Sequence, residues 1–224
     1  MIAADAASPL RILCLHGRGG SGQAFLADSL APLRDALSPG IPKQPQVPVA
    51  WEAIDSLQSG GSWWSYPAGQ RSFSATEYYG AEDSVAQVER ELASGRYCGL
   101  LGYSQGAMLA AVVGARAALG EGDKAAAEHL KFAIICSAAL PNPYRPLLER
   151  LRSSGGAPNI PTLHCLSKSD TMNPPELGEE LASCFGVASS QVLWHGAGHK
   201  VPPRDSLGEV VAWLDANVPA MPAP

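Results

Sequence analysis

Short apolar runs alternate along the chain with longer segments in which apolar residues recur at helical spacing. Apolar runs of this kind, bounded by glycine, proline and polar residues, are typical of strands that are buried on both faces of a sheet. They predict strands at residues 10–15, 49–54, 97–101, 132–136, 162–166 and 191–195.

The segments between these runs predict helices, and the clearest of them covers residues 76–93. Val85, Val88 and Leu92 mark its apolar face, whereas residues 89–91 mark its polar face. Similar patterns predict a helix that ends near Leu37 and helices at residues 107–119, 144–151, 176–185 and 207–217.

The alternation of strands and helices predicts an α/β fold with a mostly parallel central sheet and helices on both faces. The sequence contains neither an internal repeat nor a linker, so we expect a single domain over residues 1–224. Residues 1–9 and 219–224 are expected to be flexible, as chain ends commonly are.

Two segments interrupt the alternation. Residues 39–48 are rich in proline and predict a loop. Residues 58–75 are rich in glycine, serine and aromatic residues and form a loop too long for a simple turn. Trp63, Trp64 and Tyr66 lie in this second loop, where their rings either fix the loop onto the domain or line an acyl pocket. The pattern does not decide between these roles, nor whether the loop is a mobile lid.

Composition narrows the possible partners. The net charge is −5 and there is no basic block, which argues against nucleic acid as a partner. No apolar run is long enough to cross a bilayer, and residues 1–9 lack the features of a secretory signal. We therefore expect a cytoplasmic protein without a stable membrane anchor.

Five cysteines are present, and Cys14, Cys98, Cys136 and Cys165 fall in predicted buried strands. This placement favours reduced core cysteines over disulfides. No CxxC pair or His/Cys cluster suggests a metal site. We therefore expect no metal and no cofactor.

The strongest chemical motif is Gly-Tyr-Ser-Gln-Gly at residues 102–106. It lies between the apolar run 97–101 and the small-residue run 107–119, which together predict a strand, a sharp turn and a helix. Gly-x-Ser-x-Gly in that context is typical of the nucleophile elbow of α/β-hydrolases, because only small residues fit on either side of the strained serine. Ser104 is the predicted nucleophile.

A serine nucleophile needs a base, and the base needs an acid that orients it. His199 follows the last predicted strand in a glycine-containing turn, whereas His195 ends that strand, so His199 is the favoured base and His195 the alternative. Asp170 follows the strand 162–166 directly and is the favoured acid, with Glu176 as the alternative. An Asx turn or helix cap is the competing role for Asp170.

The glycine-rich segment 17–22 allows two interpretations. It matches Gly-x-Gly-x-x-Gly, but a dinucleotide site also needs an acidic residue about 20 residues later, where this chain has Ser38 and Pro39. The Lys-Ser/Thr of a phosphate-binding P-loop is also missing. In a hydrolase, the same segment would supply a backbone N–H to the oxyanion of the tetrahedral intermediate. The predicted oxyanion donors are the N–H groups of Arg18 and Gln105.

Several segments share the pattern of one known family, in addition to the elbow at residues 101–107: residues 13–17, Trp63–Trp64, residues 79–84, Asp170 and residues 198–202. Together they resemble the FSH family of serine hydrolases, which includes fungal polyketide-releasing thioesterases. Two differences from the family pattern are Ser167, where glycine is common, and Arg18, where an apolar residue is common and a cation now lies near the expected pocket. The resemblance implies an α/β-hydrolase fold without a large cap domain.

Motifs and resemblance together predict a serine esterase or thioesterase that cleaves esters of an apolar acyl group through an acyl-enzyme intermediate. Trp63, Trp64, Tyr103 and Met172 are candidate substrate-binding residues. A small carboxylesterase, acyl-protein thioesterase or lysophospholipase is the alternative within this class, and a peptidase shares the same triad. A hydrolase-fold ligand-binding protein is the alternative outside it. The sequence leaves open whether the protein is a monomer or a dimer.

Overall fold

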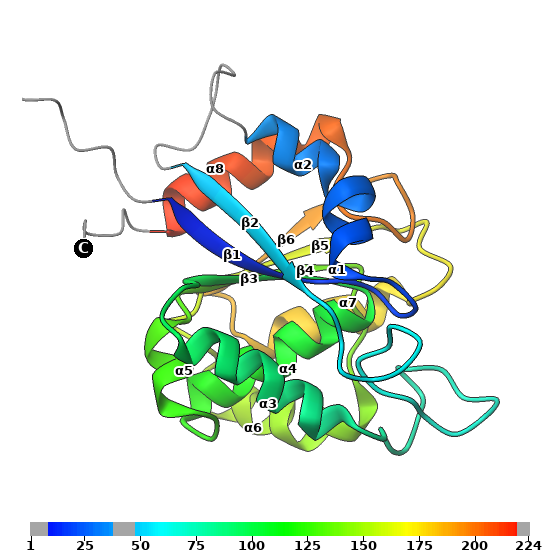
Figure 1. Ribbon diagram of the computed structural model, residues 1–224. Coiled ribbons are helices and arrows are strands. Elements are labelled where there is room, and N and C mark those ends of the chain that lie inside the picture. Colours follow the sequence, from blue (N-terminus) through cyan, green and yellow to red (C-terminus); the bar gives the residue numbers. More distant parts are fainter. Residues whose placement is uncertain (1–8, 38–47, 219–224) are drawn as a thin grey trace, which may run out of the picture.

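A computed structural model describes residues 9–37 and 48–218, which form one sheet covered by helices on both faces (Figure 1). The sheet is six-stranded in the order β2-β1-β3-β4-β5-β6. Every pairing of neighbouring strands is parallel. The strands are β1 (Leu10–Leu15), β2 (Val49–Ile54), β3 (Gly99–Tyr103), β4 (Phe132–Cys136), β5 (Thr162–Leu166) and β6 (Ser190–Trp194).

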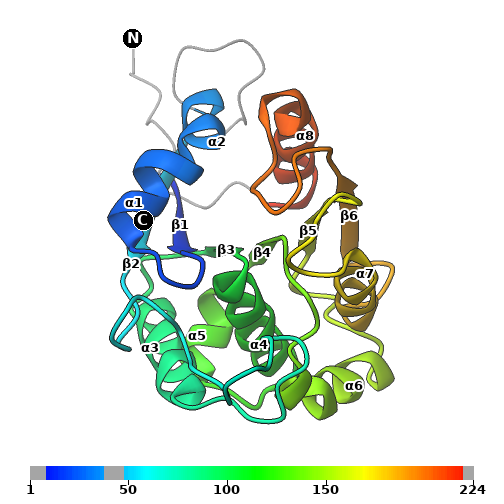
Figure 2. The same ribbon diagram turned by 90° about the vertical axis from the view of Figure 1, so that its right-hand side faces the viewer.

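The helices form two layers (Figure 2). On one face lie α3 (Ala81–Ala93), α4 (Gln105–Leu119), α5 (Lys124–His129), α6 (Arg145–Ser153) and α7 (Pro175–Cys184). On the other face lie α1 (Gly22–Ala24), α2 (Ala31–Ala36) and α8 (Leu207–Asn217). Within residues 9–37 and 48–218, no segment forms a separate cap domain.

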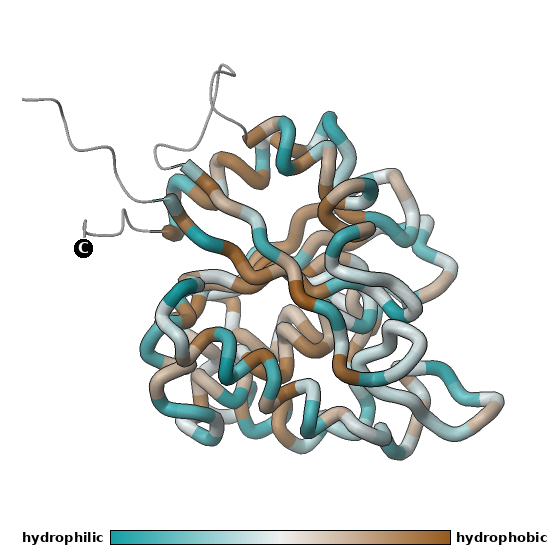
Figure 3. The backbone as a smooth tube through the Cα atoms, in the orientation of Figure 1, coloured by the Kyte–Doolittle hydropathy of each residue, from teal (hydrophilic) through white to brown (hydrophobic). Residues whose placement is uncertain are grey.

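The sheet separates two apolar cores, and alternate residues of each strand enter opposite cores. In β1, Leu13 and Leu15 pack toward α3 and α4, whereas Ile12 and Cys14 pack toward α2 and α8. Hydrophobic residues accordingly follow the central strands in Figure 3. Burial on both faces explains why the strands appear in the sequence as nearly continuous apolar runs.

Most predicted strands are confirmed in place: those at 10–15, 49–54, 132–136 and 162–166 coincide with β1, β2, β4 and β5. β3 begins and ends two residues later than predicted, because the strand continues up to the nucleophile. The helix predicted from residue 76 is wrong for its first turn. α3 begins at Ala81, because Gly80 has a φ of 79° and Tyr79 pairs with Ser65 in an antiparallel bridge. The loop predicted at 39–48 and the chain ends that were expected to be flexible lie almost entirely outside the described residues.

All five cysteines are free and buried, as expected of core thiols. Burial raises the pKa of the Cys14 thiol well above its usual range, so this thiol stays protonated. Cys184, which no predicted strand contained, lies on α7. No helix among the described residues is long and apolar enough to cross a membrane.

His164 on β5 is a core residue, and it makes stability depend on pH. Its ring is fully buried, with Nε2 at 3.2 Å from Thr162 Oγ1, and burial lowers its pKa to about 3. In the unfolded chain a histidine titrates near pH 6.5. Between these values only the unfolded chain takes up the proton, so the free energy of unfolding falls as pH falls.

We therefore expect His164→Gln to flatten the acid side of the stability profile. Each pH unit between the two pKa values costs about 1.4 kcal/mol for one proton, or about 2 kcal/mol between pH 7 and pH 5. Urea unfolding of both proteins at the two pH values measures this difference, whatever the variant loses at pH 7. Equal acid losses in both proteins would contradict the role given to His164.

Candidate active site

The turn between β3 and α4 holds Ser104 in a strained conformation, with φ 54° and ψ −116°. A Cβ on Gly102 would lie 2.3 Å from the carbonyl oxygen of Gly106, and a Cβ on Gly106 would lie 2.4 Å from that of Leu15. Both glycines are therefore required by close packing of backbone around the turn. Strain of this kind, of order 1–3 kcal/mol, is typical of functional sites.

Ser104, His199 and Asp170 form a hydrogen-bonded chain. Ser104 Oγ lies 2.9 Å from His199 Nε2, and His199 Nδ1 lies 2.8 Å from Asp170 Oδ2. The other carboxylate oxygen, Oδ1, accepts the backbone N–H groups of Met172 (2.8 Å) and Asn173 (3.0 Å). Asp170 thus makes the contacts expected of both interpretations: one oxygen forms an Asx turn and the other contacts the imidazole.

The turn that carries His199 is fixed by residues at the ends of three neighbouring strands. The Tyr103 hydroxyl donates to the His199 carbonyl (2.8 Å), and the Ser137 hydroxyl donates to the Lys200 carbonyl (2.9 Å). Ser167 Oγ accepts the Gly198 N–H at 3.1 Å. Ser167, one of the two differences from the family pattern, therefore has a structural use here.

The two alternative residues lie elsewhere. His195 Nδ1 accepts the Ala197 N–H at 3.2 Å within its own turn, and burial lowers the pKa of this imidazole. Glu176 lies in the first turn of α7, and the acid that contacts His199 is Asp170. The geometry therefore favours His199 over His195 and Asp170 over Glu176.

The predicted oxyanion donors lie where two loops meet. Within the described part of the chain, the backbone N–H groups of Arg18 and Gln105 have no hydrogen-bond acceptor. Gln105 begins α4, so its N–H lies at the positive end of the helix dipole. Gly17, which precedes Arg18, has no room for a side chain, because a Cβ would lie 2.9 Å from the Tyr103 ring.

Trp63 connects these two loops. Its indole Nε1–H donates to the His16 carbonyl (2.7 Å), and its backbone N–H donates to Gln105 Oε1 (2.9 Å). The Gln105 side-chain amide also donates to the Trp64 carbonyl at 2.9 Å. Sequence reasoning used only the backbone of Gln105 and missed this role of its buried side chain.

The prediction that Trp63 and Trp64 contact the substrate is wrong. Both side chains have 0% exposure and lie in the core beneath the loop. Trp63 stacks on His16 and Trp64 on Tyr78, with ring centroids 4.9 Å and 4.6 Å apart. The antiparallel bridge between Ser65 and Tyr79 folds the loop back on itself, and both indoles lie on the inner side of this fold.

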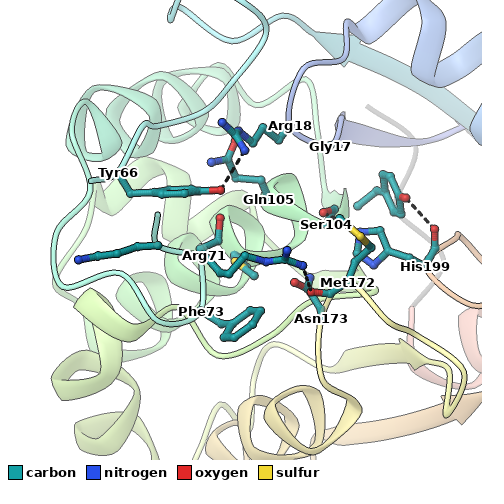
Figure 4. Close-up of a pocket in the computed structure, with 14 residues that line it drawn as sticks. Gly17, Arg18, Tyr66, Arg71, Phe73, Ser104, Gln105, Met172, Asn173 and His199 are labelled. Atoms are coloured by element: carbon teal, nitrogen blue, oxygen red, sulfur yellow. Dashed lines mark hydrogen bonds between the residues drawn. The ribbon is translucent and has the colours of Figure 1, made fainter. Parts of the chain in front are cut away.

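A cavity of about 380 Å³ opens at Ser104 and His199 (Figure 4). Tyr103 and Met172 were candidate substrate-binding residues from the sequence, and both line this cavity. Sequence reasoning missed other lining residues, of which Phe73 and Arg71 come from the same loop as the two tryptophans. The side chains around the opening, besides Ser104 and His199, include Arg18, Tyr66, Gln70, Arg71, Phe73, Gln105, Met108 and Met172.

The glycine-rich segment 17–22 is occupied by protein contacts. The Gly19 N–H donates to the Gly61 carbonyl (2.7 Å), and the Gly22 N–H donates to Asp55 Oδ1 (2.7 Å). Asp55, the acid that follows β2, thus binds the start of α1, which does not support the dinucleotide interpretation. The described residues contain no group of three or more His, Cys, Asp or Glu that could hold a metal ion.

Known proteins resemble this chain in sequence and in fold. A family model described as "Serine hydrolase (FSH1)" matches residues 6–210. Esterase OVCA2 of Danio rerio is 32% identical over 89% of this chain and 93% of its own length, and Esterase OVCA2 of Homo sapiens is 30% identical over 87% and 90%. The crystal structure of Zea mays acyl-protein thioesterase 2 superposes with a TM-score of 0.69 at 22% identity, covering 97% of each chain.

At 22% identity, the similarity to the maize structure is evidence for the fold alone and not for the activity. The fold is accordingly that of an α/β-hydrolase, as the sequence motifs predicted. The family match covers most of the sequence, including the elbow at Ser104, Asp170 and His199. By its sequence and its fold, the chain belongs to the FSH1 family of serine hydrolases.

Proposed function

We propose that this protein is a serine esterase or thioesterase in which Ser104 is the nucleophile, His199 the general base and Asp170 the residue that orients the base. The observation that carries the proposal is the hydrogen-bonded chain from Ser104 through His199 to Asp170 at a strained elbow. The names of the curated relatives, which are esterases, point to the same reaction class. The catalytic unit would be the single α/β domain.

In the first half of the reaction, Ser104 Oγ attacks the carbonyl carbon and its proton passes to His199 Nε2. The carbonyl electron pair moves to oxygen, and the oxyanion is held by the N–H groups of Arg18 and Gln105. Each donor would contribute roughly 3 kcal/mol to transition-state stabilisation. Collapse of the tetrahedral intermediate expels the alcohol or thiol, which takes the proton from His199.

In the second half, water attacks the acyl-enzyme while His199 Nε2 accepts its proton. Collapse of the second tetrahedral intermediate releases the carboxylic acid, and Ser104 Oγ regains its proton from the imidazole. Asp170 accepts a hydrogen bond from Nδ1 throughout, which fixes the tautomer and stabilises the imidazolium. None of these reaction steps requires a metal ion or a cofactor.

Fluorophosphonate labelling, read by mass spectrometry of the peptide that contains Ser104, tests this proposal. A panel of 4-nitrophenyl esters beside acyl thioesters then identifies the preferred leaving group, and a peptide amide panel tests the peptidase alternative. Labelling with turnover supports an enzyme. Absence of both would favour a ligand-binding protein with a hydrolase fold.

The five cysteines are free and buried, and free thiols persist in reducing compartments. We therefore propose the cytoplasm as the location of this protein.

The acyl group is expected to have apolar bulk, with Phe73, Met108 and Met172 as its wall instead of the two tryptophans. Each buried methylene is worth up to about 0.8 kcal/mol, or roughly a fourfold change in kcat/KM. Hexanoyl esters should therefore be cleaved at least about tenfold more efficiently than acetyl esters. Phe73→Ala and Met172→Ala should reduce that ratio.

Leu57→Ala is the matched control, because Leu57 is a 59% exposed apolar residue that does not line the cavity. Kinetics with acetyl, hexanoyl and decanoyl esters measure the profile in each protein. If Phe73→Ala and Met172→Ala keep the wild-type profile, the apolar wall has been assigned to the wrong residues.

A further inference from the structure

Two arginines line the active-site cavity without a carboxylate partner among the described residues. Arg18 Nη1 donates to the Tyr66 hydroxyl (3.1 Å), and its guanidinium lies 5.1 Å from the centre of that ring. Arg71 Nη2 donates to the Met172 carbonyl (3.1 Å), and its guanidinium lies 6.0 Å from the centre of the Phe73 ring. All of these contacts are to neutral groups, so neither guanidinium forms an ion pair among the described residues.

The lining of this cavity contrasts with the net charge of the whole chain. The chain has a net charge of −5, yet no Asp or Glu is among the residues that line this cavity. Several arginines outside the cavity have acidic partners at short distance, as in Arg150–Glu121 (2.7 Å) and Arg11–Glu52 (2.5 Å). A recess with charge of one sign concentrates ligands of the opposite sign. The cavity is therefore a positive site on an acidic protein.

Arg71 is the better placed of the two arginines. Its side chain extends toward the turn of Met172 and Asn173, on the triad side of the opening, whereas Arg18 extends toward Tyr66 (Figure 4). The Arg71 side chain also lies beside Phe73, which we assigned to the apolar wall for the acyl group. An anionic substituent on an acyl chain that runs along Phe73 would therefore come near the Arg71 guanidinium. One donor of that guanidinium binds the Met172 carbonyl, and the others remain for an anion that presents two oxygens.

From this geometry we propose that the substrate of the Ser104 site is an ester or thioester that carries an anionic group, bound mainly by Arg71 with Arg18 as a second cation. This inference rests on the proposed function and specifies its substrate class. The anion belongs either to the acyl group, as a terminal carboxylate, or to the leaving group, as a sulfonate or phosphate. A guanidinium binds either kind of anion through the same charge-assisted hydrogen bonds, and the experiment below distinguishes an acyl-group anion from a leaving-group anion.

Two matched substrate pairs test the proposal. The acyl pair is the mono-4-nitrophenyl ester of adipic acid and its methyl-capped neutral analogue. The leaving-group pair is the hexanoyl ester of 4-hydroxybenzenesulfonate and that of the neutral 4-hydroxybenzenesulfonamide. The readout is the ratio of kcat/KM for the anionic and neutral members, compared between wild type and variants, so that intrinsic reactivity cancels. The Ser104→Ala rate is subtracted as background.

In Arg71→Gln we expect the ratio for one pair to fall by about tenfold to a hundredfold, the range of a hydrogen-bonded charge pair. Arg71→Lys should keep part of the ratio, because it keeps the charge but loses the planar fork. Arg18→Gln, which retains the backbone N–H, should lower the ratio less. Arg150→Gln is the control, because it removes the same charge from an exposed pair outside the cavity.

The pair that responds identifies the side of the substrate that carries the anion, and a fall in either pair supports the proposal. A purely structural role of Arg71 would lower the rates with both members of a pair equally and leave the ratio unchanged. Unchanged ratios in Arg71→Gln and Arg18→Gln, with neutral esters still hydrolysed, would overturn this inference and leave the proposed function intact. Loss of all hydrolysis and labelling in the wild type would overturn both.

Discussion

Replacing Ser104 by alanine is expected to lower kcat by about a millionfold while the protein stays folded. The variant loses the only atom that attacks the substrate, and the residual rate would come from binding and the oxyanion donors. Alanine fits the turn as well as serine does, because its Cβ occupies the same position at φ 54°. Steady-state kinetics, fluorophosphonate labelling and the thermal midpoint measure the three parts of this expectation.

Ser72→Ala is the matched control, since Ser72 lines the same cavity but contacts neither His199 nor Asp170. It should keep both labelling and turnover. Full labelling of Ser104→Ala would show that another residue is the nucleophile. A large fall in its thermal midpoint would show that the turn depends on the hydroxyl for folding.

Replacing His199 by glutamine is expected to be nearly as damaging as loss of Ser104, because the residues of a triad act as a unit. Glutamine resembles imidazole in size but cannot accept the serine proton. The turn itself should persist, since the bond from the Tyr103 hydroxyl is to the backbone carbonyl of residue 199. The measurement is kcat for a neutral ester, together with the thermal midpoint.

His195→Gln provides the matched comparison, because His195 lies four residues earlier and its ring bonds to the Ala197 N–H of its own turn. It should retain most of the activity of a protein that remains folded. If His195→Gln were the more damaging of two stable variants, the general base would have to be reassigned to His195.

Much of this site follows from local sequence. Gly102 and Gly106 surround a serine between an apolar run and a helical run, so the elbow is specified by close neighbours in the chain. The order Ser104, Asp170, His199 along the chain reduced the number of candidates for the base and the acid further. The strands were equally clear, because burial on both faces leaves a continuous apolar run in the sequence.

The roles in the long loop did not follow from local sequence. Trp63, Trp64, Phe73 and Arg71 lie in one glycine-rich segment with no periodicity, so composition gave no direction for any side chain. Both indoles lie in the core because of tertiary contacts, which include the bridge between Ser65 and Tyr79 and the bonds of Trp63 to His16 and Gln105. The sequence did not indicate a role for Arg71 in the cavity, because an exposed arginine in a loop is usually solvated.

What the sequence determined by itself is thus the parallel α/β fold, the strained turn at Ser104 and the residue types available to a triad. These features depend on steric fit and on apolar periodicity within short stretches of chain. Only the tertiary structure decided that His199, 95 residues from Ser104, and Asp170, 29 residues from His199, meet in one chain of hydrogen bonds. It also decided that Trp63 joins the loop after β1 to the start of α4 and that two arginines line the cavity. Such contacts join residues distant in sequence, and they are set by how the loops pack at the carboxyl edge of the sheet.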